Sequence, residues 1–121
     1  MSKIKTVDSE AMAAVAVQGL QEKKGLDIVT IDLRGLGSAF TDFFVIAHGS
    51  SNRQIDALAD SVEEEMRKGL NERPTNREGS EVAEWVLLDY YNVVVHIFSK
   101  PNRDFYALEE LWGDGIVKKH D

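Results

Sequence analysis

Hydrophobic residues recur along the chain with two different periods, one typical of helices and one typical of strands. Apolar residues three or four positions apart predict a helix over residues 9–24, ended by Gly25. A longer helix is predicted after Ser51, because Ser51 and Gln54 match a capping box and a single apolar face follows them. Gly69 is predicted to end this second helix.

Strands are predicted where apolar and polar residues alternate, or where β-branched and aromatic residues dominate. Four runs have this character: residues 27–33, 43–47, 85–90 and 93–98. The polar stretch 71–84 leaves room for a short edge strand. A last amphipathic helix is predicted with Pro101 in its first turn and Gly113 at its end, followed by a loose tail from about residue 114.

These elements follow one another without a linker, a repeat or a low-complexity segment. We expect residues 1–121 to form one α/β domain, with a mixed β-sheet and helices packed mainly on one face. No run reaches the roughly 18 apolar residues that a membrane span requires, and no apolar stretch follows the N-terminal lysines. We therefore expect no membrane partner, and because the missing cysteines fit a reducing compartment, we expect a cytoplasmic protein.

The two strand patterns nearest the C-terminus predict a hairpin whose faces differ. If Tyr91 and Asn92 form a two-residue turn, Tyr90 lies opposite Val93 and the pairing continues outward from there. One face is then aliphatic apart from a tyrosine, as a helix-covered face requires. The other face mixes aromatic, aliphatic and polar groups, in the pairs Trp85 with Phe98, Leu87 with His96, and Asp89 with Val94.

A mixed face of this kind is typical of a protein interface, where large aromatic side chains often anchor binding. Its residues are therefore candidate partner contacts. Two other interpretations stay open. Trp85 could belong to a core and His96 could bond within a second packed layer. Tyr91 is also unfavourable at a turn position that needs a positive φ, so a slip of the register by one residue is a further alternative.

The chain is acidic, with 14 basic and 21 acidic residues and a formal net charge of −7. A protein that grips nucleic acid through its phosphates normally needs a basic surface. We therefore expect no direct sequence-specific nucleic-acid binding, and the charge favours a basic protein as partner. Solubility alone would also account for it.

Motifs for catalysis are missing, so we expect no catalytic residue, no metal site and no cofactor. The histidines, His48, His96 and His120, lack the close spacing of common zinc sites. The one enzymatic alternative is a divergent nucleotidyltransferase, because Gly49 and Ser50 lie between a strand and a helix as in a phosphate-binding turn. That chemistry needs two carboxylates one residue apart on a following strand, and the matching strands offer only Asp89.

Four segments carry a distinctive series of motifs: DFFVIAHGSSNRQ at 42–54, EVAEWVLLDY at 81–90, VVVHIF at 93–98 and FYALEELWGD at 105–114. In order and spacing, over roughly residues 11–115, they resemble the Iojap-like ribosomal silencing factors (RsfS). The resemblance implies a degenerate nucleotidyltransferase-like fold without enzymatic activity. One departure is the hairpin turn, where the family often has Gly–Asp and this chain has Tyr91–Asn92.

The resemblance also implies a partner, the large ribosomal subunit, contacted through ribosomal protein fourteen on the face that meets the small subunit. A factor bound there would block subunit joining and repress translation when nutrients are scarce, and could also aid large-subunit maturation. Trp85, Asp89 and His96 fall on both the family motif and the mixed face, and Leu87, Val94 and Phe98 complete the expected contact surface. A homodimer formed through the same face in the free protein is the other alternative.

Overall fold

The computed structural model describes residues 8–37, 39–79 and 84–120. Helices and strands follow one another in the order α1 (Ser9–Glu22), β1 (Leu26–Asp32), β2 (Phe43–Gly49), α2 (Asn52–Leu70), β3 (Asn76–Glu78), β4 (Trp85–Asp89), β5 (Val93–Ser99), α3 (Lys100–Tyr106), α4 (Leu108–Leu111) and β6 (Ile116–His120). Among the described residues, no helix is both long and apolar enough to cross a membrane.

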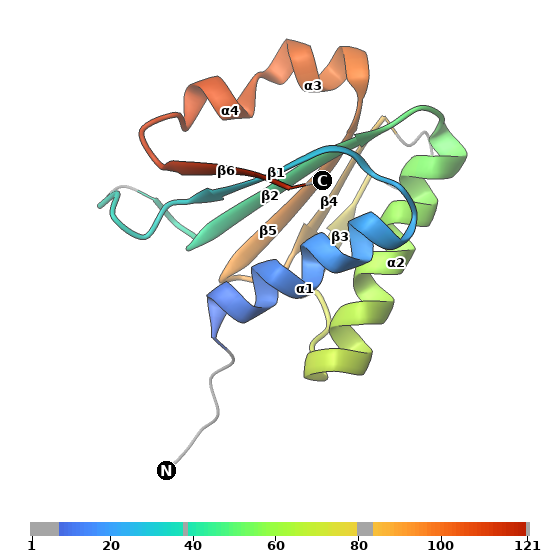
Figure 1. The fold of residues 1–121 in the computed structure, drawn as a ribbon, viewed down its shortest axis with the longest axis horizontal. Helices are drawn as coiled ribbons and strands as arrows, with labels where there is room; N and C mark the ends of the chain where they lie inside the picture. Colours follow the sequence, from blue (N-terminus) through green and yellow to red (C-terminus); the bar gives the residue numbers. More distant parts are fainter. Residues whose placement is uncertain (1–7, 38, 80–83, 121) are drawn as a thin grey trace.

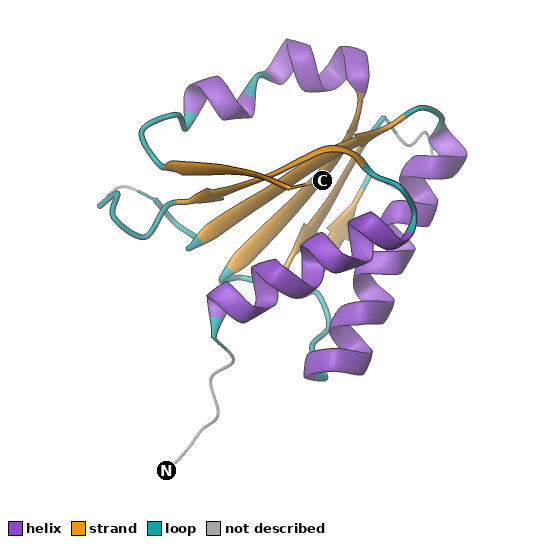
Figure 2. Cartoon of the chain, in the orientation of Figure 1, coloured by secondary structure: helices purple, strands orange, loops and turns teal. Residues whose placement is uncertain are grey.

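The strands form one six-stranded mixed sheet in the order β3-β4-β5-β2-β1-β6. The central pair, β2 and β5, is parallel, and the pairs on either side of it are antiparallel. The long helices α1 and α2 cover one face of the sheet, while the short α3 and α4 cross the other (Figures 1 and 2). The predicted α/β fold, with helices mainly on one face, is confirmed.

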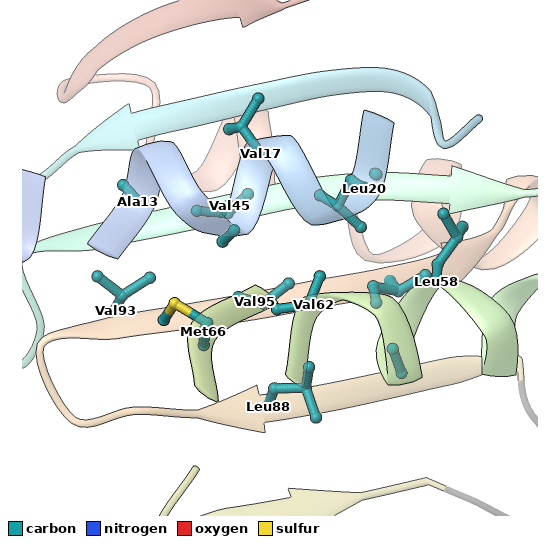
Figure 3. Close-up of a cluster of buried hydrophobic side chains, with 14 of the residues drawn as sticks. Ala13, Val17, Leu20, Val45, Leu58, Val62, Met66, Leu88, Val93 and Val95 are labelled. Atoms are coloured by element: carbon teal, nitrogen blue, oxygen red, sulfur yellow. The ribbon is translucent and has the colours of Figure 1, made fainter. Parts of the chain in front are cut away.

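The main core lies between the sheet and the two long helices (Figure 3). The aliphatic face predicted for the hairpin is part of it, and its members are almost completely buried: Val86, Leu88, Tyr90, Val93, Val95 and Ile97. Burying one such aliphatic side chain stabilises a fold by about 1.5–3 kcal/mol. A slip of one residue would expose the whole set, so this face fixes the register of the hairpin.

The turn of the hairpin has the predicted register. Tyr90 N–H donates to the carbonyl of Val93 at 2.9 Å, and Trp85 pairs with Phe98 at the far end. Tyr91 adopts a positive φ of 74° despite its side chain. Its N–H donates to Oδ1 of Asp89 at 2.8 Å, which stabilises this strained turn from within.

One predicted helix end was wrong, and one predicted helix is broken in two. Gly69 lies inside α2, which continues to Leu70 and ends at Asn71 in the left-handed conformation, with φ of 55°. Asparagine tolerates this conformation and caps helices much as glycine does. The predicted last helix is broken into α3 and α4 at Ala107, which has a φ of 47°.

The segment predicted to be a loose tail instead forms β6, antiparallel to β1. Gly115 makes this approach possible, because a Cβ there would lie 2.7 Å from Cγ2 of Ile31 and 2.8 Å from the carbonyl oxygen of Asp32. The side chains of β6 are mostly exposed, so backbone pairing rather than apolar burial holds the strand. That is why hydrophobic patterning did not reveal it.

The two long helices touch most closely at Gly19 of α1. A Cβ at Gly19 would lie 2.8 Å from Cα of Val62, and Ser61 Oγ donates to the Gly19 carbonyl at 2.7 Å. Backbone atoms cannot move aside as flexible side chains can. The spacing between α1 and α2 therefore depends on glycine at this position.

We expect Gly19→Ala to lower the free energy of unfolding by about 1–3 kcal/mol, because the added methyl group overpacks the helix crossing. Gly69→Ala is the matched control, since a Cβ there meets only Cγ1 of Val15 at 3.9 Å. It should raise the free energy of unfolding by about 0.5–1 kcal/mol through helix propensity. Urea unfolding followed by circular dichroism measures both, and a stabilised Gly19→Ala variant would contradict the proposed crossing.

Candidate protein-interaction face

We use the term mixed face for the sheet surface formed by Trp85, Leu87 and Asp89 of β4 and Val94, His96 and Phe98 of β5. The strand pairing brings all of these predicted site residues together on one side of the sheet. Their exposure differs with the strand. The β5 residues are buried, with 1–5% of each exposed, whereas the β4 residues are only partly buried. The free surface of the mixed face is therefore provided by β4.

Rings from three elements stack over one end of the mixed face. Trp85 lies on Phe98, with ring centroids 5.1 Å apart, and Tyr106 of α3 lies 4.6 Å from Trp85. Tyr106 also stacks on Phe98 at 6.2 Å. This stack buries Phe98, while Trp85 and Tyr106 keep part of their surface in solvent.

A second group of rings adjoins His96 on its other side. Phe44 of β2 meets His96 edge to face at 4.8 Å, and Trp112 meets Phe44 at 5.7 Å. Phe40 contacts both Phe44 and Trp112, yet 70% of it is exposed. Phe44 belongs to a second buried cluster, on the side of the sheet opposite the main core, and Trp112 packs against it. This cluster is therefore continuous with an exposed aromatic surface.

The α3–α4 segment carries further exposed apolar residues that were not among the predicted site residues. Phe105 and Leu111 are 78% and 71% exposed, and both lie on the α3–α4 segment. The sequence predicts one continuous amphipathic helix over this segment, and the structure divides it at Ala107 with these two side chains in solvent. A cluster of exposed aromatic and aliphatic groups is typical of a binding surface.

Arg103 holds the α3–α4 segment against the sheet. It is 6% exposed, and its Nε and Nη2 donate to the Glu109 carboxylate, each at 3.0 Å. Its Nη1 contacts the Leu26 carbonyl at 3.2 Å and Nδ1 of His48 at 2.9 Å. Burial, and then the nearby Arg103 charge, lower the pKa of His48. Arg103 therefore ties α3, α4, β1 and β2 together and positions Trp112.

His96 is a buried polar group within the mixed face. The indole Nε1–H of Trp85 donates to Nδ1 of His96 at 3.2 Å. Nε2 of His96 is buried and has no hydrogen-bond partner among the described residues. Burial lowers the pKa of His96 to about 4, so the ring is neutral at physiological pH.

The turn that suggested a nucleotidyltransferase is occupied by a side chain of the protein itself. Oε1 of Gln54 accepts from the N–H of Ser50 at 2.6 Å and from its hydroxyl at 3.0 Å. The predicted cap is confirmed, because Ser51 Oγ accepts from the Gln54 N–H at 3.1 Å. No three His, Cys, Asp or Glu side chains gather closely enough to hold a metal ion in the part of the chain that the structure describes.

The chain is similar to the known members of one protein family. The family model "Ribosomal silencing factor during starvation" (RsfS) matches residues 6–121. The ribosomal silencing factor RsfS of Halalkalibacterium halodurans is 38% identical, over 89% of this chain and 91% of its own length. That of Bacillus subtilis is 35% identical, over 95% and 96%. A crystal structure of a Chromobacterium violaceum protein, 36% identical, superposes with a TM-score of 0.82 over 88% of each chain.

The pKa of His96 makes stability depend on pH. The unfolded chain binds a proton at this residue below about pH 6.5, whereas the folded chain binds it only below about pH 4. The free energy of unfolding therefore falls as the pH drops through this window, by about 2 kcal/mol between pH 7 and pH 5. His96→Phe should lose about that much less over the same interval, measured by urea unfolding at both pH values. Equal losses in both proteins would refute the assignment.

Proposed function

The chain belongs to the ribosomal silencing factor family, and we propose that it binds the large ribosomal subunit and thereby keeps the small subunit from joining it. The observation that carries this proposal is the exposed aromatic surface around the mixed face, formed by Trp85, Tyr106 and Phe40 with their neighbours. Surfaces of this composition serve to bind macromolecules. No bond-making chemistry is needed for such a role.

The residues of the mixed face divide into two layers under this proposal. Trp85, Leu87 and Asp89 are accessible and would contact the partner directly. Val94, His96 and Phe98 lie beneath them and fix their positions through packing and ring stacking. Partly exposed tryptophan on a rigid sheet is a favourable anchor, because little side-chain entropy is lost on binding.

We infer that the partner on the subunit is a protein, ribosomal protein fourteen, rather than bare ribosomal RNA. Asp89 is the charged member of the mixed face, and it would repel a phosphate backbone. The net charge of −7 would attract a basic ribosomal protein and speed its encounter with this chain. Its apolar anchors would then supply most of the lasting affinity.

The mechanism we propose is steric exclusion. A factor seated on the intersubunit face occupies space that the small subunit needs, so every occupied large subunit is withdrawn from joining. The occupied fraction rises with factor concentration relative to its Kd, and half of the subunits are blocked when the free concentration equals the Kd. Translation would fall under nutrient limitation in proportion to this occupancy. The same contact could protect a large subunit during maturation.

We expect Trp85→Ala to weaken binding to purified large subunits by about thirtyfold or more, the effect of losing an interface anchor worth about 2 kcal/mol. Co-sedimentation with large subunits, small subunits and intact ribosomes measures the effect. Wild-type protein should pellet with large subunits alone. Ile116→Ala, at a residue 72% exposed on β6, is the matched control and should bind as the wild type does.

Three outcomes separate the possibilities. A folded Trp85→Ala variant that binds normally would remove the mixed face from the proposal but keep the function. Absence of wild-type binding would overturn the function. A wild-type dimer that Trp85→Ala dissociates, without binding to subunits, would favour the homodimer instead.

We expect prior addition of the protein to large subunits to reduce their association with small subunits, because both occupy the same face. Light scattering after mixing the subunits measures this association directly. The reduction should follow the Kd obtained by co-sedimentation and be absent for Trp85→Ala. Unchanged association at saturating factor would show that binding and silencing are separate.

A further inference from the structure

His96 carries a hydrogen-bond donor that finds no acceptor among the residues that the structure describes. The indole nitrogen of Trp85 can only donate, so Nδ1 of His96, 3.2 Å away, must be the acceptor in that bond. A neutral imidazole has one protonated nitrogen, which is then Nε2. The Trp85–His96 bond therefore fixes the tautomer and leaves an Nε2–H group to be satisfied.

No group in the described structure satisfies this donor. Nε2 is buried without a hydrogen-bond partner, and the aromatic ring nearest to the His96 ring is Phe44, nearly perpendicular at 82° with ring centroids 4.8 Å apart. An aromatic face is only a weak acceptor. A buried water is also disfavoured, because a water needs two or more polar partners and the neighbouring residues are mainly apolar: Ile46, Val94, Phe98 and Leu87.

An unsatisfied buried donor destabilises the free protein, and an apolar residue of similar shape would avoid that cost. The His96 donor lies close to residues that a partner could reach. His96 lies directly across the hairpin from Leu87, which is partly exposed, and it bonds to Trp85, which is partly exposed as well. Both are residues that we propose to contact the ribosome.

We propose that the Nε2–H of His96 donates to a carbonyl oxygen of the partner, delivered between Leu87 and Phe44 when the complex forms. This inference rests on the proposed function. A carbonyl fits better than a carboxylate or a phosphate, because an anion buried here would have no cation to pair with. Side-chain rotations of the size common at interfaces would open the path past Leu87.

The test uses two substitutions at the same position. His96→Phe keeps an aromatic ring but removes the donor, whereas His96→Gln keeps an N–H near the original Nε2. At neutral pH we expect the free energy of unfolding of His96→Phe to equal or exceed that of the wild type. Its affinity for large subunits, by co-sedimentation, should nevertheless fall about tenfold, the effect of one lost hydrogen bond. His96→Gln should bind within about threefold of the wild type.

Ile46→Val is the control for packing, because Ile46 lies beside His96 on β2 and is fully buried. It should lower stability without weakening binding. The proposal is overturned if His96→Phe is clearly less stable than the wild type, since the donor would then already have a partner. It is overturned equally if His96→Phe binds normally or if His96→Gln binds as weakly as His96→Phe. Wild-type protein that ignores large subunits would instead overturn the proposed function, and the unfolding data would still decide whether the donor is free.

Discussion

Burial of the aliphatic side of the β4–β5 hairpin beneath α2 is the constraint on which the rest of the molecule depends. Because side chains alternate along a strand, sealing Leu88 and Val95 into the main core necessarily sends Trp85 and His96 to the opposite side. The composition of the mixed face is thus set by packing on the other side of the sheet. A binding surface on this side of the sheet can therefore change only at every second residue of β4 and β5.

The opposite side of the sheet is covered only in part, and Arg103 determines how far the cover extends. Its bonds to Glu109 span the break at Ala107 and hold α4 in place, and Trp112, directly after α4, packs on Phe44. Phe105, on α3, stays exposed to solvent. By holding α4 in place, Arg103 helps to determine which aromatic residues pack into the core, such as Trp112, and which stay exposed, such as Phe105.

Features with a clear periodicity or a capping motif were predictable from the sequence, and left-handed backbone conformations were not. The hairpin register followed from alternation combined with a two-residue turn at Tyr91 and Asn92, and the start of α2 followed from Ser51 and Gln54. The left-handed residue at Ala107 carries no side-chain signal, since alanine favours helix; the conformation is held by the bond from the Ala107 N–H to the Arg103 carbonyl and by the Arg103–Glu109 pair. The β6 strand was hidden because its side chains are exposed and its stability comes from pairing with β1. Burial of His96 depends on contacts from three elements, which no local pattern encodes.

The outer edge of β6 has a consequence for how the protein behaves when concentrated. An edge strand offers unpaired backbone groups on which a second strand could dock. Lys118 and Lys119 are adjacent and exposed there, and self-pairing centred on Lys118 would set their ammonium groups against those of the other copy. Repulsion between these lysines would disfavour edge-to-edge pairing of two sheets. Molecules at high concentration would thereby be kept from polymerising through this edge.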